Sequence, residues 1–189
     1  MFTREESHAL LQQYTKSDIH LRHAYAVEAA MRGFARYFGE DEEYWGQVGL
    51  LHDLDWETSQ DPKSHPMMGA KWLREKQYPD EFVRAVLAHG WEYSGIEPHS
   101  TLEKTLYTID ELTGFITAVA LVRPSRSLAD LEVKSVKKKW KDKAFARGVN
   151  RDIIEKGCAL MGEPLEQLIE MTIEYLRPVE REIGLGAQE

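Results

Sequence analysis

The chain has 189 residues, of which 42% are hydrophobic and 30% charged, and its formal net charge is −8 at pH 7; this length suffices for one domain with a continuous core. The acidic balance argues against general binding to nucleic acid, which depends on a surplus of Lys and Arg facing phosphate. Apolar runs fall short of the roughly 20 residues of a membrane span, and the N-terminal segment does not resemble a signal peptide, so we expect a soluble, cytoplasmic protein that does not act at a membrane.

Apolar residues recur at helical spacing along nearly the whole chain, and sustained strand alternation is absent, so the sequence predicts an all-α fold. Gly, Pro, Asp and Ser interrupt the pattern at intervals of about one helix. His65 stands at a predicted helix start, because Pro66 suits the first helical position. In chain order, the predicted helices span 3–14, 18–38, 42–52, 66–77, 80–91, 101–121, 128–142, 150–160 and 164–182.

The stretch GLLHDLDW, residues 49–56, ends an apolar helical run on His52 and Asp53, side by side. Neighbours on a helix point about 100° apart, so these two side chains cannot share one face. At the end of a helix, however, two adjacent side chains can approach one ion from different directions. We therefore interpret the doublet as a candidate pair of metal ligands.

Further candidates lie at apolar helical positions, where a buried imidazole or carboxylate needs a partner. They are His23 in LRHAYAVEA, His89 in RAVLAH, and Asp110 in LEKTLYTIDELTGF. A divalent ion bound by nitrogen and oxygen offsets the cost of burying such a cluster, so the pattern favours a metal site. Asp53 has two carboxylate oxygens, which suits it to bridge two ions about 3.5–4 Å apart.

The order of His23, the doublet His52 and Asp53, and then Asp110 resembles the HD-domain superfamily of metal-dependent phosphohydrolases. The resemblance covers roughly residues 18–125. It implies a helical bundle of the HD-domain kind, in which these four residues bind one divalent metal ion.

Subfamilies with two metals place two further histidines between the doublet and the late aspartate, and His65 and His89 match that pattern. The resemblance thus implies one or two divalent ions, and imidazole and carboxylate ligands leave the metal open among Mn, Fe, Zn, Co, Ni and Mg. Asp53, as the expected bridging ligand, is the candidate catalytic residue. We interpret the chain as a single HD-like domain over 1–189, with the metal-binding core at about 18–125 and a basic segment and C-terminal helices over 126–189.

The residues after the doublet depart from many relatives, which continue as His-Asp-Ile-Gly or carry a nearby lysine. This chain continues with LDWE, residues 54–57, so no role of a lysine is carried over. Asp55 and Glu57 are expected to be solvated loop acids; the alternatives are that they orient metal ligands or reject highly anionic substrates. His20 is expected at the surface, and it is the substitute first ligand if His23 is not one.

One segment of this acidic chain is basic: KSVKKKWKDKAFARG, residues 134–148. Val133, Val136 and Trp140 repeat at helical spacing, which favours a helix with one docked face and a lysine-rich solvated face. The alternative is that cations here and just before it hold substrate phosphates above the metals. The candidates for that role are Arg123, Arg126, Lys138, Lys143 and Arg147.

The leading hypothesis is a hydrolase of phosphoric esters or anhydrides that acts on a small phosphorylated, nucleotide-like molecule through metal-activated hydroxide. The spacing of His65, His89 and Asp110 is similar to that of diadenosine tetraphosphate hydrolases, which makes a dinucleoside polyphosphate one candidate substrate. Two alternatives stay open. The same ligand set resembles the di-iron site of myo-inositol oxygenase and its HD-domain relatives, and a sensor or interaction module would keep the metal only for structure. The basic segment favours phosphate hydrolysis.

Overall fold

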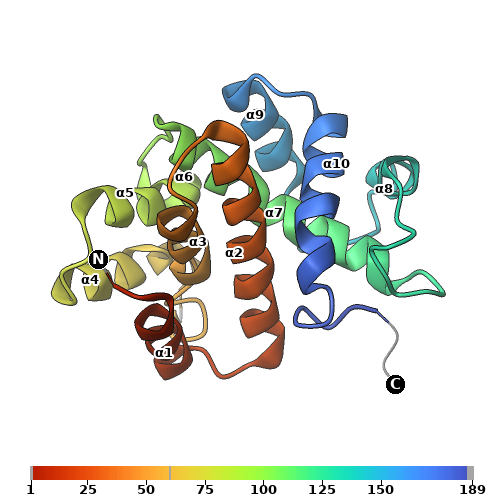
Figure 1. The fold of residues 1–189 in the computed structure, drawn as a ribbon. Coiled ribbons are helices and arrows are strands. Elements are labelled where there is room, and N and C mark those ends of the chain that lie inside the picture. Colours follow the sequence, from red (N-terminus) through yellow and green to blue (C-terminus); the bar gives the residue numbers. More distant parts are fainter. Residues whose placement is uncertain (1, 60, 187–189) are drawn as a thin grey trace.

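The computed structural model describes residues 2–59 and 61–186, which form helices and no strand (Figure 1). The all-α prediction is confirmed. None of the helices in these two ranges combines the length and the hydropathy of a membrane span. The α-helices are α1 (Arg4–Tyr14), α2 (Asp18–Phe38), α3 (Glu42–Leu51), α4 (Met67–Glu75), α5 (Asp80–His89), α6 (Trp91–Ser94), α7 (Thr101–Leu121), α8 (Val133–Trp140), α9 (Arg151–Met161) and α10 (Leu165–Leu176), and two 3-10 helices are η1 (Pro62–Ser64) and η2 (Arg177–Val179).

The helix α8 is shorter than the predicted span 128–142. Its start is delayed because the preceding loop is held by side chains: Arg123 and Ser125 donate hydrogen bonds to the carboxylate of Asp130 at 2.7 and 2.9 Å. Beyond its end, the carboxylate of Asp142 accepts from the backbone N–H of Ala144 at 3.0 Å and so closes a turn. Side chains that form hydrogen bonds with the nearby backbone compete with helix formation. The spacing of apolar residues does not predict such hydrogen bonds.

Two further departures lie at helix ends, and a third is an additional short helix. The helix α10 stops at Leu176, well before the predicted residue 182, and Pro178 follows in η2; proline has no N–H to continue an α-helical ladder. Pro66 is the residue before α4 rather than its first residue. The four-residue helix α6 lies within a stretch for which the sequence predicted no separate helix.

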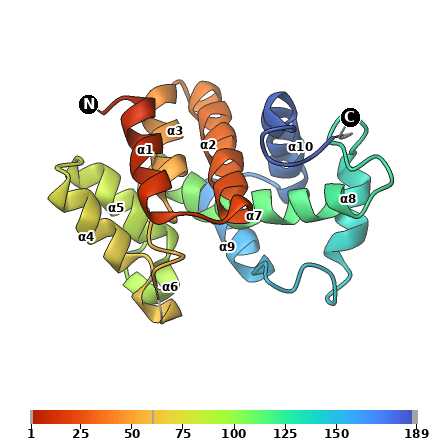
Figure 2. The same cartoon turned by 90° about the horizontal axis from the view of Figure 1, so that it is seen from below.

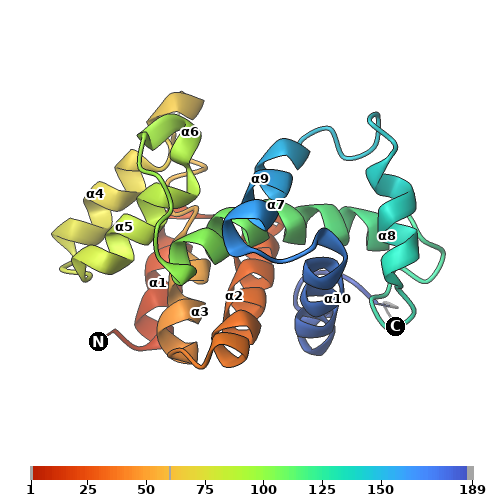
Figure 3. The ribbon, with the colours of Figure 1, turned by 90° about the horizontal axis from the view of Figure 1, so that it is seen from above.

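The long helix α7 runs through the middle of the molecule (Figure 2). Figure 3 shows α2, α3 and α10 on one side of it and α9 on the other, with α4, α5 and α6 towards one end and α8 at the opposite end. Its start is fixed by a capping box, in which Ser100 and Glu103 satisfy each other's backbone N–H groups. Because α7 is covered on several sides, many residues in its middle are buried.

The helix α2 is positioned by the apolar stripe that the sequence predicted. Ala24, Val27, Ala30, Met31 and Phe34 are all buried in the core, and α2 packs mainly against α3 and α7. Burying such side chains contributes roughly 1.5–3 kcal/mol each for the larger ones. This packing fixes the rotation of α2 and brings the residues near its N-terminal half towards α7.

The contact between α7 and α9 depends on a small residue. Gly157 of α9 lies directly against Thr108 of α7, and a Cβ atom at this glycine would come within 2.1 Å of the threonine hydroxyl. Two helices can approach this closely only where one of them lacks a side chain. Thr108 is two residues before Asp110, so this close approach places α9 beside the part of α7 that carries Asp110.

Candidate metal centre

Four of the predicted ligands converge where α2, α3 and α7 meet. His23 comes from α2, His52 from the C-terminal cap of α3, Asp53 from the turn that follows, and Asp110 from α7. The Nε2 atom of His23 lies 2.9 Å from Oδ1 of Asp110 and 3.8 Å from Oδ2 of Asp53. The Nε2 atom of His52 lies 3.3 and 3.4 Å from the same two oxygens. Two imidazole nitrogens and two carboxylate oxygens therefore face one point.

The other oxygen of Asp53 faces a second pair of histidines. Its Oδ1 atom lies 3.2 Å from Nε2 of His65 and 3.4 Å from Nε2 of His89, and these two nitrogens are 3.0 Å apart. His65 precedes α4, and His89 is the last residue of α5. The carboxylate of Asp53 thus lies between two groups of imidazole nitrogens, with one oxygen towards each.

Two of the rings are oriented by the backbone of their own helices. Nδ1 of His52 donates to the carbonyl oxygen of Gly49 at 2.7 Å, and Nδ1 of His89 donates to that of Val86. A carbonyl oxygen only accepts, so each Nδ1 carries a proton and, in the neutral ring, Nε2 carries a lone pair. Both lone pairs face carboxylate oxygens, which also only accept. A proton or a cation must therefore lie between them.

The electrostatics of the cluster lead to the same requirement. His52 is completely buried, and its Nε2 has no hydrogen-bond partner among the described residues. Burial opposes a charge on this ring, but the carboxylates of Asp53 and Asp110 outweigh it and raise the pKa of His52 well above its usual value. Burial also opposes charge on both carboxylates, yet the neighbouring His52 holds the pKa of each well below its usual range. A divalent ion fits a site with these nitrogen and oxygen donors.

Asp55 was expected to be a solvated loop acid, and this expectation is wrong. Its side chain is buried; one oxygen accepts from Nδ1 of His65 at 2.7 Å and the other from the backbone N–H of Gly69 at 2.9 Å. Burial lowers the pKa of His65, but the hydrogen bond to Asp55 outweighs that effect and raises it. The alternative role weighed for Asp55, orienting a ligand, agrees with this geometry: it turns Nε2 of His65 towards Asp53.

Glu57 is tied to the start of α2. Its carboxylate accepts from the backbone N–H groups of Lys16 and Ser17 at 2.9 and 2.8 Å, and it lies 2.8 Å from Nδ1 of His20. Glu57 therefore caps the chain ahead of α2 and holds His20 beside the cluster. His23 rather than His20 reaches the carboxylate of Asp110.

Replacing Asp55 by asparagine tests its orienting role. The amide keeps the size of the carboxylate, but its nitrogen cannot accept a hydrogen bond, so only one of the two N–H donors keeps its acceptor. We expect metal affinity or activity to fall about 10- to 100-fold, the usual effect of losing a partner of a ligating histidine. Metal titration of the stripped protein measures the change. Glu57→Gln, two residues away and without contact to His65, is the matched control. Equal metal affinity in both variants would contradict the role.

A family model described as the HD domain matches residues 21–114. The chain belongs to the HD-domain superfamily. HD domains bind divalent metals, and members of the superfamily are generally metal-dependent hydrolases. Neither the curated proteins nor the solved structures include a match to the chain. The range matched to the HD domain contains all six clustered residues, which are His23, His52, Asp53, His65, His89 and Asp110.

A cavity of about 800 Å³ opens over the cluster of the HD domain. Sequence reasoning did not identify several of its lining residues: Trp56, Glu92, Tyr107 and Glu111. Of these, only Glu111 had a sequence signal, because it follows Asp110 on the helix. Burial, together with the charge of Asp110, raises the pKa of Glu111 to about 8. The cavity therefore contains two carboxyl groups, Glu92 and Glu111, in addition to those of Asp53 and Asp110.

The candidate phosphate contacts are distributed unevenly around the HD domain. Arg126 lines the cavity. Arg123 lies in an ion pair with Asp130 at 2.7 Å, which holds the loop before α8. The remaining candidates are exposed and lie outside the described lining of the cavity: Lys138, Lys143 and Arg147.

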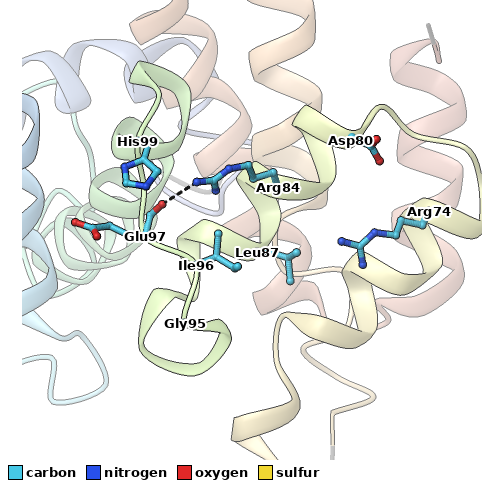
Figure 4. A pocket seen from close by; sticks show the side chains of 8 residues that line it. All are labelled: Arg74, Asp80, Arg84, Leu87, Gly95, Ile96, Glu97 and His99. Atoms are coloured by element: carbon cyan, nitrogen blue, oxygen red, sulfur yellow. Dashed lines mark hydrogen bonds between the residues drawn. The ribbon is translucent and has the colours of Figure 1, made fainter.

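A second cavity, of about 540 Å³, lies between α4, α5 and the segment 95–99 (Figure 4). Its guanidinium groups come from Arg74 and Arg84. The latter donates to the backbone oxygen of Glu97 at 3.2 Å, the dashed contact in the figure, and lies 3.6 Å from the carboxylate of Glu103. His99 lines this cavity and is therefore separate from the histidines of the metal cluster.

Proposed function

We propose that this HD domain hydrolyses a phosphoric ester or anhydride of a small, nucleotide-like molecule. The observation that carries the proposal is the position of Asp53, whose Oδ2 faces His23 and His52 while its Oδ1 faces His65 and His89. A carboxylate between two groups of imidazoles suits a bridging ligand of two ions, and pairs of ions are typical of phosphatases and nucleases.

Two overlapping ligand sets follow from these distances. The groups whose ligand atoms lie close enough together to share an ion are His23, His52 and Asp110, and His52, Asp53 and His89. Because Nε2 of His65 also lies 3.2 Å from Oδ1 of Asp53, we assign the first ion to His23, His52, Asp53 and Asp110, and the second to Asp53, His65 and His89. When bound, divalent ions lower the pKa of coordinated water towards ~7 and stabilise charge on phosphoryl oxygens, so the hydrolysis needs no serine or cysteine nucleophile.

The other side chains of the cavity bind and orient the substrate in this proposal. Arg126 is exposed at the cavity, and its carbonyl oxygen accepts from the N–H of Gly186 at 2.7 Å, which fixes the backbone under the side chain. A guanidinium group is well suited to phosphate oxygens, because its N–H groups can bind two of them at once. We assign Arg126 to phosphate oxygens of the substrate at the edge of the metal cluster.

The hydrolase proposal is tested without oxygen. Protein stripped with a chelator and reloaded with Mn²⁺, Co²⁺ or Zn²⁺ should bind one to two ions per chain and cleave p-nitrophenyl phosphate or members of a nucleotide panel under anaerobic conditions. Elemental analysis and phosphate release are the measurements. Turnover that depends on dioxygen and iron would replace hydrolysis by the di-iron oxygenase alternative, and a loaded, folded protein with neither activity would leave the sensor alternative.

The role of Arg126 has a matched test. Arg126→Met and Lys143→Met remove the same charge, but only Arg126 lines the cavity. We expect Arg126→Met to raise KM for a phosphorylated substrate by roughly tenfold, the scale of one charged hydrogen bond, with unchanged metal content. Lys143→Met should leave KM unchanged. Equal KM values in the two variants would remove Arg126 from the site.

A further inference from the structure

The opening of the cavity is surrounded by apolar side chains. Within the described residues, four of the seven exposed large hydrophobic residues line this cavity: Ile19, Trp56, Tyr93 and Leu121, with exposed fractions of 74%, 47%, 52% and 41%. They come from the start of α2, the turn after α3, α6 and the end of α7. Single exposed apolar residues are ordinary, but a group around one opening is typical of a ligand-binding surface.

The apolar surface continues inside the cavity. Small and branched side chains from α2, α7, α9 and the neighbouring loops cover its wall, namely Ala26, Ala118, Val149, Ile153 and Ile183. A wall of this kind gains free energy by covering apolar parts of a ligand, at about 25 cal/mol per Å² of apolar surface removed from water. These five side chains offer no hydrogen bonds to a sugar or to a chain of phosphates; the hydrogen-bonding groups of the lining come from other positions, such as Thr117 and Asn150.

The charged side chains of the lining do not favour a polyphosphate. Apart from the proposed metal ligands, the guanidinium and carboxyl groups of the lining are those of Arg22, Arg126, Glu92 and Glu111. Glu92 lies 3.6 Å from Lys156, which is outside the lining, so its charge is partly offset. Even so, two exposed guanidinium groups are few for a chain of three or four phosphates, because such a chain carries about four negative charges that need several cations.

We infer that the substrate is a phosphate monoester of a bulky apolar or aromatic alcohol, with its phosphate at the metal cluster and its organic part against this apolar wall. The inference rests on the proposed hydrolysis of a phosphoric ester, and it replaces the nucleotide-like organic part of that substrate by an apolar one. In the reaction, one water molecule adds its oxygen to phosphorus, the bond from phosphorus to the alcohol oxygen breaks, and the alcohol leaves with one of the water protons. The products are one alcohol and one inorganic phosphate, without oxidation or reduction.

A matched pair of substrates tests the apolar contact. Ethyl phosphate and 2-(1-naphthyl)ethyl phosphate are both esters of primary alcohols, so their leaving groups are chemically alike and only the apolar part differs. With metal-loaded wild-type protein we expect KM for the naphthyl ester to be at least about tenfold lower, because of the larger apolar area that it buries. Equal KM values, or a lower KM for a nucleoside triphosphate than for the naphthyl ester, would overturn the inference.

Neighbouring residues supply the matched variants. Leu121 lines the cavity, whereas Val122 is 58% exposed and does not line it. Leu121→Ser should raise KM for the naphthyl ester by roughly fivefold and leave KM for ethyl phosphate unchanged, while Val122→Ser should change neither. Ile19→Ser is the second test variant, because its side chain is so exposed that its loss has little effect on folding. The inference fails if both cavity variants keep the wild-type KM ratio.

Binding of the uncharged product separates this inference from the proposed function. We expect 2-(1-naphthyl)ethanol to bind to metal-free protein in a calorimetric titration, more weakly to Leu121→Ser and equally to Val122→Ser. If the alcohol binds in this way but no ester is cleaved, the hydrolase proposal fails and the apolar cavity stands. If both esters are cleaved with equal KM and the alcohol does not bind, hydrolysis stands and the inference about the substrate is wrong.

Discussion

Replacing Asp53 by alanine is expected to remove nearly all bound metal and to lower turnover by several orders of magnitude. Asp53 is the one residue of the cluster whose two oxygens face both groups of histidines, at 3.4 and 3.8 Å on one side and 3.2 and 3.4 Å on the other. Each proposed ion therefore loses a charged ligand, and four neutral imidazoles with one remaining carboxylate would have to balance two divalent charges. Elemental analysis and steady-state rates measure the two effects.

Glu92→Gln is the control for this experiment. Glu92 lines the same cavity, but its carboxylate accepts from the hydroxyl of Tyr107 at 2.7 Å and does not contact the histidines of the cluster. The control should keep the metal content of the wild type. If Asp53→Ala were to bind as much metal as Glu92→Gln and to react as fast, the assignment of the cluster as a metal centre would be wrong.

The second large effect separates one ion from two. His65→Ala and His89→Ala should each remove about one metal equivalent and leave the ion that His23, His52 and Asp110 hold, because each is the partner of the other on Oδ1 of Asp53. Activity should fall by orders of magnitude in both variants if the reaction needs both ions. His52→Ala should instead affect the first ion.

An unchanged metal content in both variants, together with near wild-type turnover, would leave a single ion as the functional metal. The variants would then report only the packing of the two rings, which typically contributes 0.5–3 kcal/mol to the free energy of unfolding. The position of His65 at a predicted helix start suggested that its ring has few packing contacts. In the structure the ring is buried and packs against Trp56 in a T-shaped arrangement, so its removal costs more packing. The thermal unfolding of each variant should therefore be measured together with its metal content.

The fold was largely predictable because the helices of this chain bury clear apolar stripes. The boundaries of α2 and α7 agree with the predicted spans 18–38 and 101–121. The predicted helix boundaries are wrong where local polar contacts end a helix that the apolar spacing alone would continue, as in the loop that Asp130 holds before α8. Such contacts depend on residues that are close in space and have no periodic signature.

The clustered residues were predicted from apolar placement and from the order of histidines and aspartates, and the structure brings all six together. Asp55 was misjudged because a carboxylate in a non-helical turn gives no sign of its burial until the chain folds over it. The position of Arg126 beside the cavity, in contrast to Lys138 and Lys143, likewise depends on how the loops after α7 fold. Sequence spacing does not determine that path.

The cluster joins parts of the chain that are far apart in sequence: 87 positions separate His23 and Asp110, whose side chains meet at 2.9 Å. A ligand that recognises only this folded arrangement acts as a reversible cross-link, and at 100 times its dissociation constant it adds about 2.7 kcal/mol to stability by mass action. The lifetime of the protein in a cell should then follow the supply of free metal. Loss of the metal would raise the unfolded fraction about 100-fold, and the unfolded chain is the form that proteases cleave.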